Sequence, residues 1–65
     1  IAKGEQLKEH STKIPALLVC VSGNAVFSNE ENIVINLQSG SYVLIEPNVK
    51  HRVDALEESN FLLIK

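Results

Sequence analysis

The chain has 65 residues, of which 45% are hydrophobic, and a formal net charge of −2 at pH 7. A chain of this length forms one domain at most and buries only about 60% of the surface that its unfolded form exposes. Its hydrophobic content is too high for a disordered segment. The six basic residues are scattered, which excludes the clustered positive surface of a nucleic-acid-binding protein. No stretch approaches the ~20 apolar residues that span a bilayer, so we expect neither nucleic acid nor membrane as a partner.

Small domains usually depend on a disulfide, a metal or a partner chain for their stability. Cys20 is the single cysteine, so no internal disulfide can form. The sequence opens on Ile1 rather than methionine. We therefore expect one domain over residues 1–65 that lacks N-terminal strands. A free cysteine and the absence of an export signal from the printed sequence predict a cytoplasmic location.

Short strands and turns are predicted along the first half of the chain. Residues 1–9 are predicted to form a loop or an edge strand, and residues 10–15 an irregular connection. Residues 16–21 are apolar without interruption, which predicts a strand buried on both faces. Gly23 lies in a compact turn after this strand, and residues 25–28 are predicted to return as its hairpin partner.

The second half continues the same pattern. Four further strands are predicted over residues 33–37, 42–45, 51–55 and 61–64. Strands of about five residues, with turns about every eight to twelve residues, are typical of an all-β sandwich or barrel. We therefore predict an all-β domain of antiparallel strands with almost no helix.

The spacing of glycine and histidine resembles the two sequence motifs of the small single-domain cupins. Gly4 precedes His10 by five intervening residues, as in the first motif, and Gly40 and His51 keep the spacing of the second. The resemblance covers residues 4–55. It implies a cupin-like double-stranded β-helix, which is a jelly-roll barrel.

Only two of the four metal-ligand positions of the cupin motifs carry the family's residue in this sequence. The family uses two histidines and a glutamate from the first motif and a histidine from the second. His10 and His51 keep two of these four positions, whereas Thr12 and Ala16 stand where the second histidine and the glutamate belong. Asn48 stands at a glycine of the second motif, and asparagine tolerates the left-handed conformation expected there.

By this resemblance, His10 and His51 are the candidate ligands of a divalent metal such as Zn, Fe, Ni or Mn. Catalytic metal sites usually have three protein ligands, so the cofactor is left open. The more ordinary alternatives are a surface-loop His10, a hydrogen-bonded interior His51 and a Cys20 that is a small buried hydrophobe. The residues predicted to line a ligand site in the barrel lumen are His10, Thr12, Ala16, Leu18, Cys20, His51 and Val53.

The predicted strand at residues 16–21 has a second apolar face. If its other side chains face the lumen, Leu17, Val19 and Val21 face outward, and burying them is worth roughly 5–9 kcal/mol at 1.5–3 kcal/mol each. Residues 61–64 support the same argument. We therefore expect a homodimer packed sheet on sheet.

Three functions follow from the sequence, and it leaves open whether the protein is an enzyme. The first is a small cupin-domain protein of unassigned activity that binds a small molecule in the barrel lumen with little or no catalysis. The second is a metal-dependent cupin enzyme, an isomerase or dioxygenase, with a metal on His10 and His51. The third is a structural or regulatory dimer module with a filled barrel.

Overall fold

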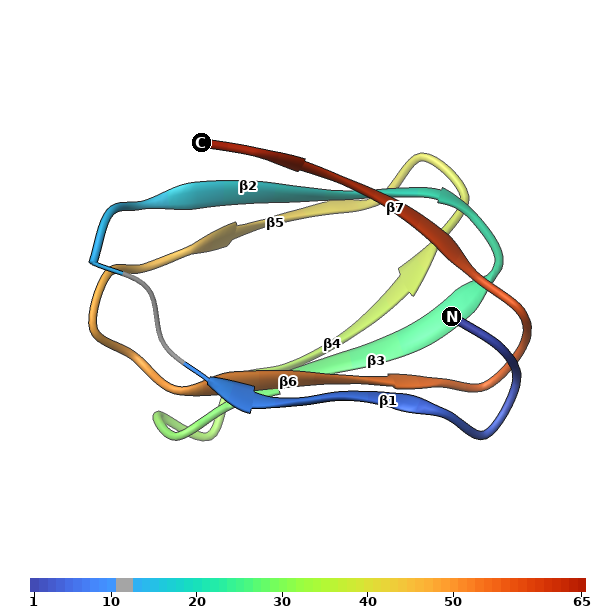
Figure 1. Cartoon of the computed structure of the whole chain (residues 1–65), viewed down its shortest axis with the longest axis horizontal. Coiled ribbons are helices and arrows are strands. Elements are labelled where there is room, and N and C mark those ends of the chain that lie inside the picture. The colour runs from blue at the N-terminus through green and yellow to red at the C-terminus, as the bar shows by residue number, and fades with distance from the viewer. Residues whose placement is uncertain (11–12) are drawn as a thin grey trace.

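The structure is a computed structural model that describes residues 1–10 and 13–65, and it places two antiparallel sheets face to face (Figure 1). The described residues form seven strands and no helix, so none of them belongs to a helix that could cross a membrane. The predicted all-β class is confirmed. The strands are β1 (Gln6–His10), β2 (Ala16–Ser22), β3 (Asn24–Asn29), β4 (Val34–Gln38), β5 (Tyr42–Ile45), β6 (His51–Ala55) and β7 (Asn60–Ile64).

One sheet has the strand order β1-β6-β3-β4 and the other has the order β5-β2-β7. The three-stranded sheet is the upper layer of Figure 1, and the four-stranded sheet lies below it. Each observed strand pair is antiparallel. Strands that follow one another in sequence therefore often lie in different layers, and the core forms between the layers.

The hairpin predicted between residues 16–21 and 25–28 is wrong. β2 pairs with β5 and β7, whereas β3 pairs with β4 and β6 in the other sheet. Gly23 carries the chain from one sheet to the other with φ at 107°, and a Cβ there would collide with Glu58 O and with Ser59. The connection is a crossing between layers, where the backbone approaches too closely for any side chain.

The alternation of side chains along each strand sends one face of each sheet into the core. Phe27, Leu37 and Val53 are the largest side chains that are fully buried there. They come from three neighbouring strands of the four-stranded sheet, and residues of β2 and β5 cover them from the opposite layer. The buried apolar residues are Ala16, Leu18, Cys20, Ala25, Phe27, Leu37, Val43, Ile45, Val53 and Ala55.

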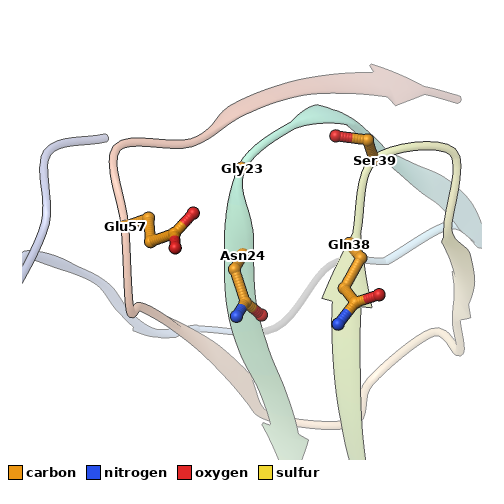
Figure 2. Close-up of a pocket in the computed structure, with 5 residues that line it drawn as sticks. All are labelled: Gly23, Asn24, Gln38, Ser39 and Glu57. Atoms are coloured by element: carbon orange, nitrogen blue, oxygen red, sulfur yellow. The ribbon is translucent and has the colours of Figure 1, made fainter.

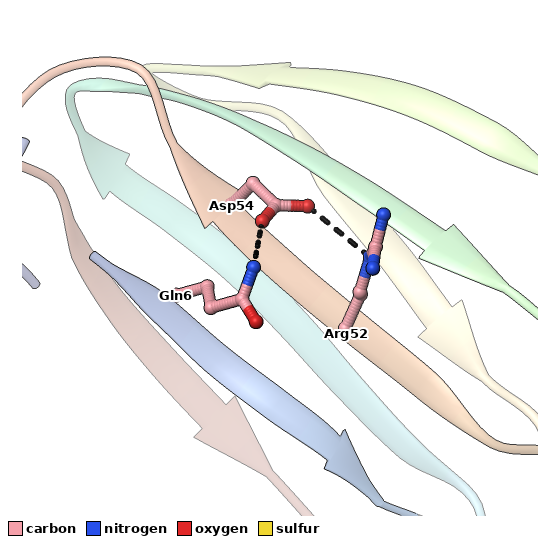
Figure 3. A network of polar contacts seen from close by, with 3 residues as sticks. All are labelled: Gln6, Arg52 and Asp54. Atoms are coloured by element: carbon pink, nitrogen blue, oxygen red, sulfur yellow. Dashed lines mark hydrogen bonds and ion pairs between the residues drawn. The ribbon is translucent and has the colours of Figure 1, made fainter. Parts of the chain in front are cut away.

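A polar network lies on the solvent side of the four-stranded sheet (Figure 3). Gln6 on β1 donates a hydrogen bond from Nε2 to Asp54 Oδ1 on β6. Arg52 Nε lies 3.3 Å from Asp54 Oδ2, and the Arg52 side chain is 53% exposed. Exposed ion pairs of this kind contribute little to stability, so the network marks this face as solvent-facing rather than as a source of stability.

Substitution of Gly23 tests the crossing between the sheets. We expect Gly23→Ala to lower the free energy of unfolding by about 2–4 kcal/mol, because the new Cβ would overlap Ser59 and because alanine is strained at this φ. Gly40→Ala is the matched control. It carries the same backbone strain at φ 89° but meets nothing within 4 Å, so it should cost only about 1–2 kcal/mol. Urea unfolding followed by far-UV circular dichroism measures both, and equal losses would contradict the close-approach argument.

Candidate functional site

His51 begins β6 and points into the interior of the barrel. It is only 3% exposed, and its ring stacks on Phe27 with the centroids 5.8 Å apart and an interplanar angle of 23°. Its Nδ1 lies 3.3 Å from Val49 O. The turn before β6 includes Asn48 at φ 62°, which confirms the left-handed conformation predicted for this residue. The chain turns sharply at Asn48, and the His51 ring that follows points inward.

The sheet register places the backbone of His10 beside that of His51. β1 and β6 are antiparallel, and His10 is the Cα partner of His51, with an irregularity in β1 between Leu7 and His10. The two positions predicted as metal ligands are therefore neighbours in the four-stranded sheet. Thr12 was also predicted to line the ligand site, and it lies outside the described residues.

The other predicted lining residues belong to the hydrophobic core. Ala16, Leu18 and Cys20 on β2, and Val53 on β6, are 0–5% exposed. They form one packed cluster together with Phe27. All four side chains are therefore buried in the core. Around these positions the interior is occupied by their own side chains and by the Phe27 ring.

Cys20 has the environment of a structural thiol. It is fully buried, and burial raises the pKa of the thiol, with a smaller opposing effect from its hydrogen bond to Ser22 O at 3.5 Å. The thiolate is the nucleophile and the metal ligand, so a raised pKa suppresses both roles. Among the described residues, no group of three or more His, Cys, Asp or Glu side chains could hold a metal ion.

Two hollows lie on the surface, away from the predicted site. The larger has a cavity volume of about 370 Å³ and lies where the Gly23 crossing meets the loops after β4 and β6 (Figure 2). Asn24 and Gln38, which are partners in the β3–β4 register, line it beside Glu57 and Ser39. The smaller has a volume of about 260 Å³ and lies at the other end of β3. Neither hollow could be predicted from the sequence, because most of their lining residues are polar residues at strand ends and turns that form no motif.

No protein-family model matches the sequence, and no curated protein matches it. Several solved structures have a similar fold. A protein of unknown function from Streptococcus pyogenes has a TM-score of 0.90 and 22% identity, over 97% of this chain and 54% of that one. A cupin superfamily protein from Desulfitobacterium hafniense has a TM-score of 0.93 and 20% identity, over 100% of this chain and 59% of that one. A cupin protein from Bacteroides fragilis has a TM-score of 0.82 and 27% identity, over 97% of this chain and 56% of that one.

Two facing antiparallel sheets, with strands that alternate between the layers, define a small jelly-roll barrel. These structural neighbours show that the chain has a cupin-type fold. The predicted fold and the predicted resemblance to cupins are confirmed. The chain spans between 54% and 59% of the length of the three similar structures.

The pH dependence of stability reports the environment of Cys20. Because burial raises the pKa of the folded thiol, the unfolded chain loses the proton first as the pH rises. The free energy of unfolding should therefore be unaffected by this group below about pH 8.5 and should fall above it. Cys20→Ala should be less stable than the wild type at every pH, but its stability should not show the additional fall above about pH 8.5. Thermal unfolding midpoints between about pH 7 and pH 9.5 compare the two proteins, and identical slopes would refute the assignment.

Proposed function

We propose that this cupin-type domain binds a small organic molecule at the His51 end of its barrel and does not act on it chemically. The observation that carries the proposal is the burial of His51, a polar and titratable side chain, inside an otherwise apolar core. The contact of its Nδ1 with Val49 O and its stacking on Phe27 hold the imidazole in one orientation. An apolar pocket with a few placed polar groups is the usual composition of a small-molecule site.

The core restricts the binding region to this end of the barrel. Leu18, Cys20 and Val53 are packed with Phe27 in the hydrophobic cluster. Their side chains fill the middle of the barrel, so we expect the ligand above them, at the His51 end. The Phe27 ring also holds the imidazole of His51 by stacking. A ligand at this end would contact His51, and the neighbouring His10 position and Thr12 belong to the same predicted site.

The proposal of binding without catalysis rests on the shortage of reactive groups inside the barrel. Among the residues whose burial the structure describes, His51 and Cys20 are the titratable side chains of the interior. Nucleophilic catalysis by a thiol needs its thiolate form, which an adjacent base or a lowered pKa usually supplies. The raised pKa of the Cys20 thiol makes it a poor nucleophile at neutral pH.

A metal-dependent enzyme, of the isomerase or dioxygenase type, is the second candidate function. The observation in its favour is the register that pairs His10 with His51 on neighbouring strands. Two imidazoles make an incomplete site, because catalytic sites usually have three protein ligands. The described residues offer no third donor beside His51. The third candidate, a structural module, is favoured by the packed core.

Native mass spectrometry of the purified protein, with elemental analysis, tests the proposal. We expect a bound organic mass that disappears in His51→Phe, a variant that keeps an aromatic ring against Phe27 but loses the imidazole nitrogens. Arg52→Ala is the matched control, because Arg52 is exposed on the opposite face of β6, and it should leave the bound mass unchanged.

Three other results would each have a clear meaning. Stoichiometric Zn, Fe, Ni or Mn in the wild type, absent from His51→Phe, would favour the metal-dependent enzyme over this proposal. Equal retention of the organic molecule by wild type and His51→Phe would place its site elsewhere. The absence of any bound mass, together with no change in the His51 ring resonances when small sugars and organic acids are added, would leave the structural module.

A further inference from the structure

The smaller surface hollow lies on the solvent side of the four-stranded sheet and has a cavity volume of about 260 Å³. Its floor follows the strand register, because Ser28 on β3 is the Cα partner of both Val34 on β4 and Arg52 on β6. Directly opposed residues of antiparallel strands project to the same face, so these three side chains form one row across the sheet. We name this site the Arg52 hollow, and its lining residues are Ser28, Asn29, Asn32, Val34 and Arg52.

The guanidinium of Arg52 brings a positive charge to one side of the hollow. Its Nε lies 3.3 Å from Asp54 Oδ2, and Asp54 Oδ1 accepts a hydrogen bond from Gln6. In Figure 3 the guanidinium meets Asp54 through Nε and extends away from that carboxylate. Among the residues that the structure describes, no hydrogen bond or ion pair engages the two Nη groups. They are therefore available as a fork of two parallel donors, which matches the two oxygens of a carboxylate.

The polar lining residues beside Arg52 offer further donors. The Ser28 hydroxyl makes no hydrogen bond to the part of the chain that the structure describes. The Asn29 Oδ1 accepts hydrogen bonds from the backbone N–H groups of Glu31 at 2.9 Å and Ile33 at 3.1 Å. These two contacts use the oxygen of the Asn29 amide and leave its Nδ2 as a donor. This side of the hollow therefore suits a ligand group that accepts hydrogen bonds and carries negative charge.

The opposite side of the hollow is apolar. Val34 is 68% exposed and lies at the far end of the row from Arg52. Neighbouring strands are about 4.8 Å apart, so the two positions are separated by roughly 10 Å. A carboxylate on Arg52 with a short carbon chain spans this distance and covers Val34. The volume of about 260 Å³ is below the roughly 300–1,000 Å³ of sites for drug-sized ligands, so a small molecule is the occupant that fits.

We propose that the Arg52 hollow binds the carboxylate of a small aliphatic acid, whose carbon chain lies over Val34. A carboxylate suits this site better than a phosphate, because Asp54 lies on the same guanidinium and Glu31 lies in the adjacent turn. A singly charged anion meets less repulsion from these two carboxylates than a phosphate, which carries about −1.5 to −2 at neutral pH.

The Arg52 hollow is separate from the proposed ligand site inside the barrel. Adjacent residues of a strand project to opposite faces, so Arg52 faces solvent, whereas the His51 ring lies in the interior. An acid bound weakly in the exposed hollow dissociates during purification and adds nothing to an organic mass retained inside the barrel. The two proposals can therefore fail independently of each other.

A titration with butyrate, followed by the backbone amide resonances in ¹H–¹⁵N correlation spectra, tests this site in the wild-type protein. We expect saturable shifts centred on Ser28, Val34 and Arg52, with a dissociation constant on the order of 1–10 mM for a ligand of about six non-hydrogen atoms. Butyramide is the matched neutral probe, since it keeps the carbon chain and loses the charge, and it should cause no saturable shift. Sodium chloride holds the ionic strength constant throughout.

Two variants with the same change of net charge then identify the contact with the acid. Arg52→Gln should weaken butyrate binding roughly tenfold or more, because it removes the charged fork. Lys65→Gln is the matched control, since Lys65 is exposed and follows β7 in the other sheet, and it should bind butyrate like the wild type. His51→Phe should also retain butyrate binding in this hollow.

Several results would overturn the proposal. The absence of saturable shifts with butyrate would do so, as would equal shifts with butyramide, and both readouts use the wild-type protein and need no variant to fold. Tighter binding of inorganic phosphate than of butyrate would overturn the assignment of a carboxylate. Equal weakening by Arg52→Gln and Lys65→Gln would show a general effect of charge instead of a site at Arg52.

Discussion

The close approach of the Gly23 backbone to residues 58 and 59 is the constraint on which the arrangement of the strands depends. At this corner β2 leaves one sheet and β3 enters the other, and the segment that leads into β7 packs directly against the crossing. The Ser59 hydroxyl is fully buried there; it accepts a hydrogen bond from Asn24 N–H at 3.1 Å and donates one to Glu57 O at 2.9 Å. One corner therefore fixes where three strands begin or end, and it does so with its buried polar groups satisfied.

The crossing also determines what lies at the centre of the barrel. It sends β3 into the middle of the four-stranded sheet, where Phe27 is the register partner of both Ile35 and Val53. From there the Phe27 ring reaches the His51 ring. The candidate site is thus continuous with the core, and a change at His51 alters packing as well as chemistry. This is why a ring-for-ring substitution separates the two effects better than a truncation to alanine.

Much of the fold could be predicted from the sequence because its signals are local. Residues 42–45 and 51–55 are predicted as strands and are β5 and β6. A short apolar run bounded by turn residues defines the first, and alternation defines the second. The pairing of β2 could not be predicted in the same way. A local pattern does not identify the partner of a strand, and here the partners, β5 and β7, lie far along the chain.

In the candidate site, too, local sequence predicts some features, whereas others depend on strand pairing. The inward direction of His51 follows from its alternation with Val53 and Ala55, and all three are buried. The filling of the interior depends on Phe27, which comes from another strand, so the sequence did not show whether the lining residues surround a space. The sequence also missed that Tyr42 and Leu44 extend the outward surface of β2, because this needs the register between β5 and β2.

Hydrophobicity alone does not distinguish the two faces of the three-stranded sheet. A slip of one residue in register exchanges the faces of a strand, and on β2 both faces are apolar. Side-chain size separates them instead. The inward face carries Ala16, Leu18 and Cys20, of which two are small, whereas the outward face carries Leu17, Val19 and Val21. A slip would push larger side chains into a filled core, where overpacking costs about 1–3 kcal/mol. The corner at Gly23 opposes the same slip, because a residue with a Cβ would then occupy its place.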